Sequence, residues 1–503
     1  MTDGSYFSSV VFFGFLAGGI YWFSQHLYHI FTLIFLCYHV IFRILNNVYK
    51  EDRLSTLMVS ISGIRGVVGK GLTPDIIQKY ALAFGTFINK SPLVVGRDSR
   101  TSGTFISNLL KGCLQATGCE IIDIGIVPTP TVQMEIIRHK AAGGVAVTAS
   151  HNPAEWNGLK FMDGNGRFLS PDNAEKVFKI ADQGDFRFNE WKKVGNEIKD
   201  LRANEKHVEA VLALPFIDVS SLKKRNFTVA IDCVNGAGGL IIPKLLEALN
   251  CNIVPINIDP SGKFAHTPEP LPENLGQLKK AVLESKADIG FAVDPDVDRC
   301  AIVDNNGNPF GEELTLALAV KFYLSKKLGS VVVNMSTSRA SEDIAKYYNC
   351  PFIRSKVGEI NVVEEMIAQD AVIGGEGNGG VILPELHLGR DAPLAVTIAL
   401  QSLLEFGGIS SDLSLSLPRY YMIKDKINIE GKNPDLIINK LIDQFSDKKV
   451  DLLDGLKIDD EDHWVHLRRS NTEPIIRIIA EAKTVKEART IVQNYVDIIN
   501  KIS

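Results

Sequence analysis

The sequence predicts an α/β protein with three similar domains, each built on a mostly parallel, mixed sheet, and a smaller C-terminal α+β domain. The length of 503 residues is the first observation, since domains commonly have roughly 100–200 residues. The second is that short β-branched runs bounded by Gly, Asp or Asn alternate with longer segments of helical spacing from about residue 58 to 415. This alternation is typical of βα units around buried sheets. The third is that this alternation of strand-like runs and helical segments stops at about residue 416.

The expected elements divide the chain into four blocks. Residues 58–200 contain the strand-like runs "LVVG", "EIIDIG" and "GGVAVTAS" and helical segments at 74–88 and 104–117. Residues 201–305 contain "FTVAIDC", "NIVPIN" and "DIGFAVD", and residues 306–415 contain "SVVVNM". The charged segment "KKVGNEIKDLRANEK" suits a junction between the first two blocks. Residues 416–503 contain "DKINIEG", "GLKIDDEDHWVHLRRS", "PIIRIIAEA" and a final helix at 485–499, which predicts an antiparallel sheet.

Residues 1–57 form an apolar N-terminal extension with no charged residue between Gly4 and Phe42. A membrane span needs about 20 apolar residues, so residues 4–45 are long enough for an anchor. The alternative is translation from an upstream start, with the native beginning near Met58. The extension lacks the basic start and small-residue cleavage site of a signal peptide. The remainder indicates a cytoplasmic protein that is membrane-bound only if the extension is real.

Charge and cysteine usage exclude several classes of protein. The formal net charge of −5 argues against nucleic-acid binding, which usually requires a basic excess. The seven cysteines are scattered singly, without zinc spacing, and are expected to be reduced.

The segment "DPDVDRC" carries three alternating carboxylates, Asp294, Asp296 and Asp298, directly after a strand-like run. Clustered acids repel one another unless a cation binds them, and oxygen-only ligands suit Mg²⁺. An EF-hand is excluded because Arg299 and Asn305 occupy its sixth and twelfth positions. The alternative is a solvated acidic turn. Arg299 suggests that an anion such as phosphate also approaches here.

Ser150 follows the strand-like run "GGVAVTA", and ligands bind at the carboxyl ends of strands in open α/β sheets. Taken alone, Ser150 fits a turn or cap serine better, because Ser-x-Asn-Pro is favourable turn chemistry. A serine hydrolase is disfavoured by the absence of a G-x-S-x-G elbow and by the adjacent His151. Lys160 and the nearby glycines suit phosphate chemistry.

Two further loops carry polar groups. In "GGEGNGGVILPELHLGRDA", Glu376 and Asn378 could bind sugar hydroxyls. His387 and Arg390 follow in the same segment and are weaker candidates for the site. The segment "RRSNTEP" at 468–474 offers guanidinium, hydroxyl and backbone N–H groups for a phosphate. The alternatives are a glycine-rich turn and a polar hairpin turn.

Together these loops resemble the α-D-phosphohexomutase family, whose hallmark segments are matched in order by "TASHNP", "DPDVDR", "GEGNGG" and "RRSNTEP". The resemblance covers the chain from about Met58 to its end. It implies four domains around a central active-site cleft, with one loop from each. Asn378 and Asn471 depart from the commonest Ser and Gly of these motifs, and the first departure puts the identity of the sugar in doubt.

The resemblance also implies roles for individual residues. Ser150 would be a phosphoserine, and its oxygen would bind Mg²⁺ together with Asp294, Asp296 and Asp298. Lys160 would be an acid/base, and Arg65 and Arg299 would assist near the transferred group. The substrate-binding candidates are Glu376, Asn378, His387, Arg469, Ser470, Asn471, Thr472 and Arg477.

The activity that follows is interconversion of hexose 6-phosphate and hexose 1-phosphate, with a hexose 1,6-bisphosphate as intermediate and activator. Glucosamine phosphate is the first candidate substrate, and mannose and glucose phosphates are the alternatives. A Mg²⁺-dependent phosphatase and a non-catalytic sugar-phosphate binder are hypotheses of other classes. A monomer or homodimer is expected.

Overall fold

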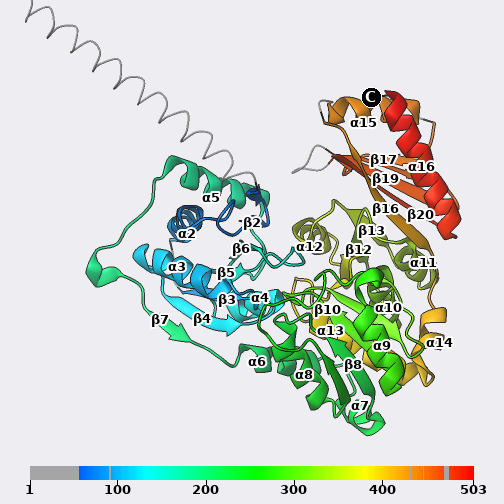
Figure 1. Ribbon diagram of the computed structural model, residues 1–503, viewed down its shortest axis with the longest axis horizontal. Helices are drawn as coiled ribbons and strands as arrows, with labels where there is room; N and C mark the ends of the chain where they lie inside the picture. Colours follow the sequence, from blue (N-terminus) through cyan, green and yellow to red (C-terminus); the bar gives the residue numbers. More distant parts are fainter. Residues whose placement is uncertain (1–55, 90–91, 431–432, 446, 470–474, 503) are drawn as a thin grey trace, which may run out of the picture.

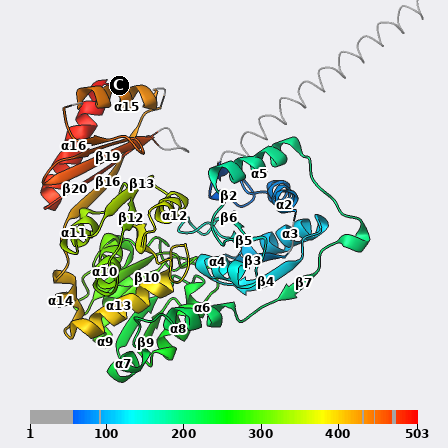
Figure 2. The same cartoon turned by 180° about the vertical axis from the view of Figure 1, so that it is seen from behind.

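The structure is a computed structural model that describes residues 56–502 apart from 90–91, 431–432, 446 and 470–474. Four sheets follow one another along the chain, and we call the units built on them domains I to IV (Figures 1 and 2). Three sheets are mixed and mostly flanked by helices, and the fourth is wholly antiparallel. The predicted fold class is thereby confirmed. The expected anchor lies outside the described residues, and none of the described helices is long and apolar enough to cross a membrane.

Domain I has a seven-stranded sheet in the order β1-β2-β6-β5-β3-β4-β7. Its strands are β1 (Met58–Ser60), β2 (Gly63–Val67), β3 (Leu93–Arg97), β4 (Ile121–Ile126), β5 (Gly143–Val147), β6 (Trp156–Asp163) and β7 (Glu197–Lys199). Its helices are α2 (Pro74–Ile88), α3 (Gly103–Ala116), α4 (Thr129–Arg138) and α5 (Pro171–Gln183), followed by the short η1 (Trp191–Lys193). Strands β5, β3, β4 and β7 run parallel.

Domain II has a four-stranded sheet in the order β11-β10-β8-β9, in which only the β10–β11 pair is antiparallel. Its strands are β8 (Thr228–Asp232), β9 (Asn252–Ile256), β10 (Ile289–Val293) and β11 (Cys300–Asp304). Its helices are α6 (Ala203–Leu212), α7 (Val219–Arg225), α8 (Gly238–Ala248), η2 (Pro272–Asn274) and α9 (Gly276–Ser285).

Domain III repeats this design with the strand order β13-β12-β14-β15. Its strands are β12 (Val331–Asn334), β13 (Phe352–Ser355), β14 (Ile373–Glu376) and β15 (Gly380–Ile382). Its helices are α10 (Glu312–Lys326), α11 (Arg339–Tyr347), α12 (Glu359–Ala368), α13 (Ala392–Phe406) and α14 (Ser410–Leu415).

Domain IV has the antiparallel order β16-β20-β19-β18-β17. Its strands are β16 (Tyr421–Asn428), β17 (Val450–Asp451), β18 (Leu456–Asp459), β19 (His463–Arg469) and β20 (Ile475–Ala482). Its helices are α15 (Pro434–Gln444) and α16 (Val485–Ile502).

Local sequence explains several helix boundaries. Helices α5 and α13 each begin with a proline in the first turn, where its missing N–H costs nothing. The side chains of Ser170 and Asp391 cap these helices by accepting N–H groups of Asn173 and Leu394. Both helices end at a glycine with positive φ, which needs no Cβ to be accommodated.

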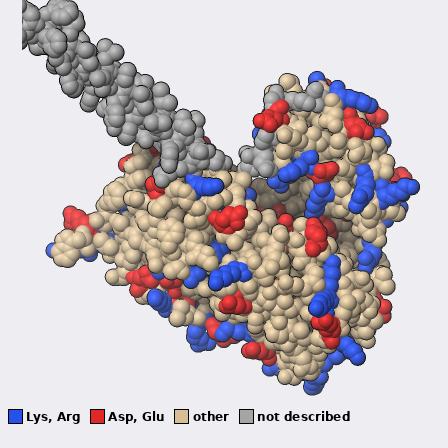
Figure 3. Space-filling view, viewed as in Figure 1, with Lys and Arg blue, Asp and Glu red and all other residues tan. Residues whose placement is uncertain are grey.

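The hydrophobic core is divided unequally among the domains. One continuous cluster of buried side chains runs through domains II and III, whereas domains I and IV have cores of their own. Domains II and III therefore share one packed core. Figure 3 shows a hollow between domains I and IV, above this shared body.

Candidate active site

A cavity of about 450 Å³ lies at the meeting of the four domains. Domain I contributes Arg65, Ser150, His151, Lys160 and Phe168 to its lining, and domain II contributes Glu269 and Arg299. Domain III contributes Glu313, Glu359, Glu376, Asn378 and Arg390, among others, and domain IV contributes Lys424, Arg468, Arg477 and Ile479. Seven of the lining residues are Arg or Lys and four are Glu, so the cavity favours an anionic ligand. A wider depression of about 1020 Å³ around Phe216 and Gln401 contains no motif residue.

Ser150 lies just beyond strand β5, in a loop that hydrogen bonds to Thr148 and Asp98 hold in place. Its φ of 51° is unusual for a residue with a side chain and costs about 1 kcal/mol or more. The Ser150 N–H donates to Thr148 Oγ1 (2.9 Å), and Thr148 Oγ1 donates in turn to Asp98 Oδ2 (2.7 Å). These bonds fix the hydroxyl at the mouth of the loop.

Arg100 is the second support of this loop, and sequence reasoning missed it. Its guanidinium is buried and donates to the carbonyl oxygens of Ser150 (2.6 Å), Asn152 (2.7 Å), Pro153 (2.5 Å) and Trp156 (2.8 Å). It also pairs with Asp98 Oδ2 at 3.0 Å. The sequence signal was three charged residues that follow an apolar run, in "VVGRDSR".

The carboxylate trio lies directly opposite Ser150. Ser150 Oγ donates to Asp294 Oδ2 across 3.3 Å, although the two residues are 144 positions apart. The backbone N–H groups of Asp298 and Arg299 donate to Asp294 Oδ1 at 3.1 Å each, which closes the loop. Strand β10 ends at Val293, so the trio stands at the carboxyl end of a parallel strand, where the motif predicts it.

This trio fits a divalent metal ion. One oxygen from each of Asp294, Asp296 and Asp298 lies within 4.8 Å of the others, and all three side chains are buried. Asp296 Oδ1 and Asp298 Oδ1 are buried, and neither has a hydrogen-bond partner among the described residues. Burial, and then repulsion by Asp298 and Asp296, raise the pKa of Asp294 well above its usual range. Buried oxygens of this kind are stabilised by a hard cation such as Mg²⁺.

Two cations from other domains hold the remaining oxygens of the trio. Lys160 Nζ lies 2.7 Å from Asp296 Oδ2 and 3.6 Å from Asp298 Oδ2. Burial would lower the pKa of Lys160, but the charges of Asp296 and Asp298 outweigh it and raise that pKa. Arg390 lies 2.6 Å from Asp298 Oδ2, so the side chain with the weaker claim in the sequence is central in the structure.

The glycine-rich loop between β14 and β15 presents Glu376 and Asn378 to the cavity. Glu376 accepts from Asn334 Nδ2 (2.8 Å) and pairs with Arg390 (2.9 Å). Burial would raise the pKa of Glu376, but Arg390 keeps it below its usual value. Asn378 Oδ1 is buried, has no hydrogen-bond partner within the described part of the chain, and is available to a ligand hydroxyl. A Cβ at Gly377 would lie 1.8 Å from Glu313 Oε2, so a side chain at this position would displace the Glu313 carboxyl group.

Arg65, Arg299 and Arg477 form a cationic side of the cavity. Burial lowers the pKa of Arg65, and the charges of Arg299 and Arg477 lower it further. Arg299 also pairs with Glu269 at 3.1 Å. Three guanidinium groups that repel one another mark a place where a phosphate would be stabilised.

The predicted phosphate loop is described only at its edges. Ser470, Asn471 and Thr472 lie outside the described residues. Arg469 pairs with exposed Asp435 at 3.0 Å and does not line the cavity, whereas its neighbour Arg468 does. Arg468 and Arg477 are cross-strand partners on β19 and β20 and face the cavity together.

His387, like Arg469, is not among the residues that line the cavity. Its ring is buried and lies 2.9 Å from Asp391, which also bonds to His207 at 2.8 Å. Because His207 belongs to α6 and bonds Thr131 of α4 at 2.8 Å, this network ties domains I, II and III together. Glu313, Glu359 and Lys424 line the cavity and were not anticipated, since nothing marks them in the sequence.

Comparison with known proteins agrees with this geometry. Models of the phosphoglucomutase/phosphomannomutase alpha/beta/alpha domains I, II and III match residues 57–188, 205–307 and 311–420, and the model of the C-terminal domain matches 427–498. The chain therefore belongs to the α-D-phosphohexomutase family. It is a phosphohexomutase, an intramolecular phosphotransferase of the isomerase class.

Individual relatives cover nearly the whole matched region. A phosphoglucomutase/phosphomannomutase of Thermococcus kodakarensis is 38% identical over 85% of this chain and 95% of its own. A probable phosphoglucosamine mutase of Pyrococcus horikoshii is 34% identical over 88% and 97%. Among solved structures, a phosphoglucomutase/phosphomannomutase family protein of Burkholderia thailandensis has a TM-score of 0.77 and 25% identity, over 88% of this chain and 98% of its own.

Proposed function

We propose that the chain is a phosphoglucosamine mutase that works through a phosphoserine at Ser150 and a bisphosphorylated sugar intermediate. The observation that carries the phosphoserine is the position of Ser150 Oγ, 3.3 Å from Asp294 Oδ2 inside a cationic cavity shared by four domains. A turn serine would not need a buried carboxylate trio opposite its hydroxyl.

Asp294, Asp296 and Asp298 would hold Mg²⁺ together with an oxygen on Ser150. When bound, the ion supplies positive charge that stabilises a phosphoryl group in transfer. The solved complex of an Aspergillus fumigatus N-acetylphosphoglucosamine mutase contains magnesium and GlcNAc-6P. That protein is 14% identical to this chain and shares its fold with a TM-score of 0.54.

A sugar hydroxyl attacks the phosphorus of phosphoserine, the bond from phosphorus to Ser150 Oγ breaks, and the hydroxyl proton ends on Oγ. Lys160 is the candidate carrier of that proton, because an ammonium held charged by Asp296 and Asp298 suits a donor to the departing oxygen. The reverse step, with the intermediate turned over, returns the other phosphate to Ser150.

Because the bisphosphorylated intermediate has to bind in two orientations, we propose that different cationic groups bind its two phosphates. Arg65, Lys160 and Arg299 are proposed to neutralise the transferred phosphate near Ser150. Arg468 and Arg477 of domain IV, with Ser470, Asn471 and Thr472, are proposed to bind the phosphate that does not react. Glu376 and Asn378 are proposed to bind sugar hydroxyls in either orientation.

The choice of glucosamine rests on two supports. Several relatives of 33–35% identity are named as probable phosphoglucosamine mutases. In addition, Glu313 lies against the sugar loop and lines the cavity, where its carboxyl group can accept a hydrogen bond from the amino group of a 2-amino sugar. Glucose and mannose phosphates are the second candidates, favoured by the name of the relative of 38% identity.

A substrate panel tests the sugar. Initial rates with glucosamine, glucose and mannose 6-phosphates, each with Mg²⁺ and the matching 1,6-bisphosphate, should give a kcat/KM at least about tenfold higher for glucosamine, near the value of one lost charged hydrogen bond. Higher values for glucose or mannose would replace glucosamine as the substrate. Steady release of inorganic phosphate without isomerisation would contradict the mutase mechanism.

Ser150→Ala tests the phosphoserine. We expect the rate to fall at least about 10³-fold, because the covalent route is removed. Ser170→Ala is the matched control, since Ser170 caps helix α5 and is not among the residues that line the cavity. Near-normal turnover by Ser150→Ala would refute the covalent mechanism while leaving the substrate assignment testable.

A further inference from the structure

Strand β7 is the outer edge of the domain I sheet. It pairs with β4 on one side, and among the described residues no strand pairs with its other side. All three of its residues are exposed, and Figure 1 shows the strand at the end of the sheet, on the connection from domain I to domain II. Proteins usually cover or interrupt such an edge, because its free N–H and C=O groups can pair with another chain.

The backbone groups that face outward can be identified. The Asn196 C=O accepts from the Ile121 N–H at 2.8 Å, and the Asp200 N–H donates to the Asp123 C=O at 3.0 Å. Successive residues of a strand direct their backbone groups to alternate sides, so Ile198 also faces β4. Glu197 and Lys199 therefore direct their N–H and C=O groups away from the sheet.

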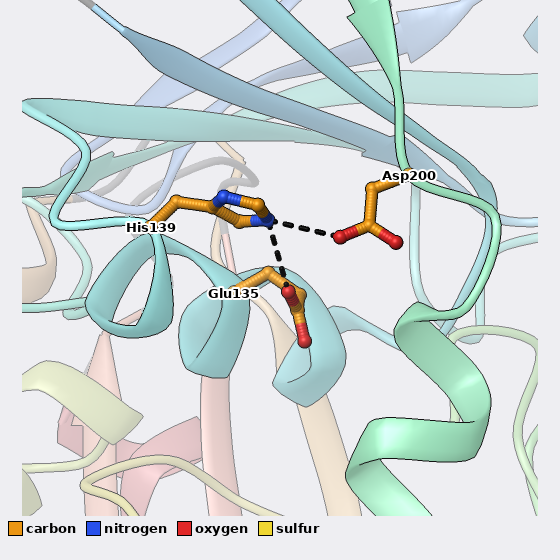
Figure 4. A group of neighbouring side chains, drawn as sticks. All are labelled: Glu135, His139 and Asp200. Atoms are coloured by element: carbon orange, nitrogen blue, oxygen red, sulfur yellow. Dashed lines mark hydrogen bonds and ion pairs between the residues drawn. The ribbon is translucent and has the colours of Figure 1, made fainter.

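The edge is held firmly at both ends. Glu197 pairs with Lys111 of helix α3 at 2.9 Å. Just after the strand, Asp200 accepts from His139 Nε2 at 3.1 Å, and Glu135 lies 3.3 Å from the same nitrogen (Figure 4). A preformed edge loses little conformational entropy when it binds a partner.

The cluster of Glu135, His139 and Asp200 is an ion-pair cluster. Arg138 lies 3.2 Å from Glu135, and Lys206 contacts Asp200 and lies 3.9 Å from Glu135. The two carboxylates are thus balanced by two cations, which would have to leave before a metal ion could bind. These contacts join the segment after β7 to helices α4 and α6.

We propose that two copies of this chain pair edge to edge through β7, antiparallel, about a twofold axis at Ile198. In this register Glu197 of each copy lies opposite Lys199 of the second copy, and the two residues exchange both backbone hydrogen bonds. The two Ile198 side chains meet in the narrow non-hydrogen-bonded pair between them. Shifting the register by one pair places Glu197 opposite Glu197 or Lys199 opposite Lys199. Repulsion between these like charges disfavours the shifted registers, so the central register is expected.

The same segment supplies apolar area for the interface. Phe188, Trp191 and Leu201 are 64%, 82% and 71% exposed. A stable interface buries about 1,200–2,000 Å² in total, which a three-residue strand pair cannot reach without such neighbours. The pairing leaves the cavity open, because Arg65 on β2 and Lys160 on β6 lie toward the opposite edge of the sheet.

Charge reversal tests the register. Native mass spectrometry of the full chain in one nonionic detergent should show a dimer that dissociates on dilution. Lys199→Glu places glutamates opposite each other, and Glu197→Lys places lysines opposite each other, so each should weaken the dimer at least about tenfold. An equimolar mixture of the two variants, one labelled with ¹⁵N, should regain dimers of mixed mass. The double variant Glu197→Lys/Lys199→Glu should regain the homodimer.

Mutase activity is the control for folding, and it should be unchanged in all variants, since neither residue is among those that line the cavity. A wild-type chain that remains monomeric at about 100 μM overturns the proposal. A dimer that withstands Lys199→Glu also overturns it and places the contact elsewhere. Lys199→Glu is the deciding variant, because Glu197→Lys also breaks the pair with Lys111 that holds the edge. These outcomes are independent of the substrate.

Discussion

Arg390→Met is the perturbation whose effect the structure specifies most closely. The guanidinium lies 2.6 Å from Asp298, 2.8 Å from Glu359 and 2.9 Å from Glu376, and all four side chains are buried. Removing one partner of a buried ion pair costs about 3–5 kcal/mol, because the other charge stays buried and uncompensated. Here three carboxylates would lose their common cation. We expect the free energy of unfolding to fall by about 3 kcal/mol or more.

A double-mutant cycle with Glu359→Gln measures the interaction energy between Arg390 and Glu359. Urea unfolding of the wild type, both single variants and the double variant should give a coupling energy of about 1–3 kcal/mol. Arg469→Met is the matched control, since its guanidinium pairs with Asp435 at 3.0 Å in an exposed position and should contribute less than about 1 kcal/mol. If Arg390→Met costs no more than Arg469→Met and the coupling is near zero, Arg390 does not hold the three loops together.

Three further predictions concern groups around the cavity. Burial raises the pKa of Glu313 to about 8, against the opposing charge of Lys424, so its folded form binds a proton that the unfolded chain has lost. Wild-type stability should therefore fall relative to Glu313→Gln as the pH rises from about 4.5 to 8, by about 2–4 kcal/mol, and parallel unfolding curves at pH 5 and pH 9 would contradict this. Asp296→Asn should raise the Mg²⁺ concentration for half-maximal activity at least about tenfold, as one of three charged ligands is lost, and an unchanged Mg²⁺ titration would place the ion elsewhere. Arg100→Lys should lower kcat by roughly 10–100-fold with little change in KM, because a lysine cannot hold four carbonyl oxygens and the Ser150 loop shifts; a change in KM alone would assign Arg100 to binding.

The sequence was informative where the chemistry depends on neighbours in the chain. A strand followed by "TASHNP" or "DPDVDR" predicts a polar loop at the carboxyl end of a sheet, and the structure places Ser150 and Asp294 in such loops. The change of pattern after residue 416 likewise predicts the antiparallel sheet of domain IV. These features are local, since β-branched runs, glycines and prolines restrict the backbone wherever they occur.

Partners across the fold were not predictable in the same way. Arg390 bonds to Asp298, which is 92 positions away in the sequence, and Arg100 bonds to Ser150, which is 50 positions away. Arg468 and Arg469 are neighbours in "RRSNTEP", and the candidate site included Arg469. Neighbours on a strand point to opposite faces, and the register of β19 directs Arg468 into the cavity.

The sequence by itself determined the fold class, the order of the four loops and the kind of chemistry they carry, because each depends on residues adjacent in the chain. Only the tertiary structure decided which arginines hold the loops together, which side chains line the cavity, and that a charged linker contains the edge strand β7. Those outcomes depend on packing between segments far apart in sequence. The identity of a charged residue in the sequence does not show whether the fold buries its side chain against a carboxylate or leaves it in water.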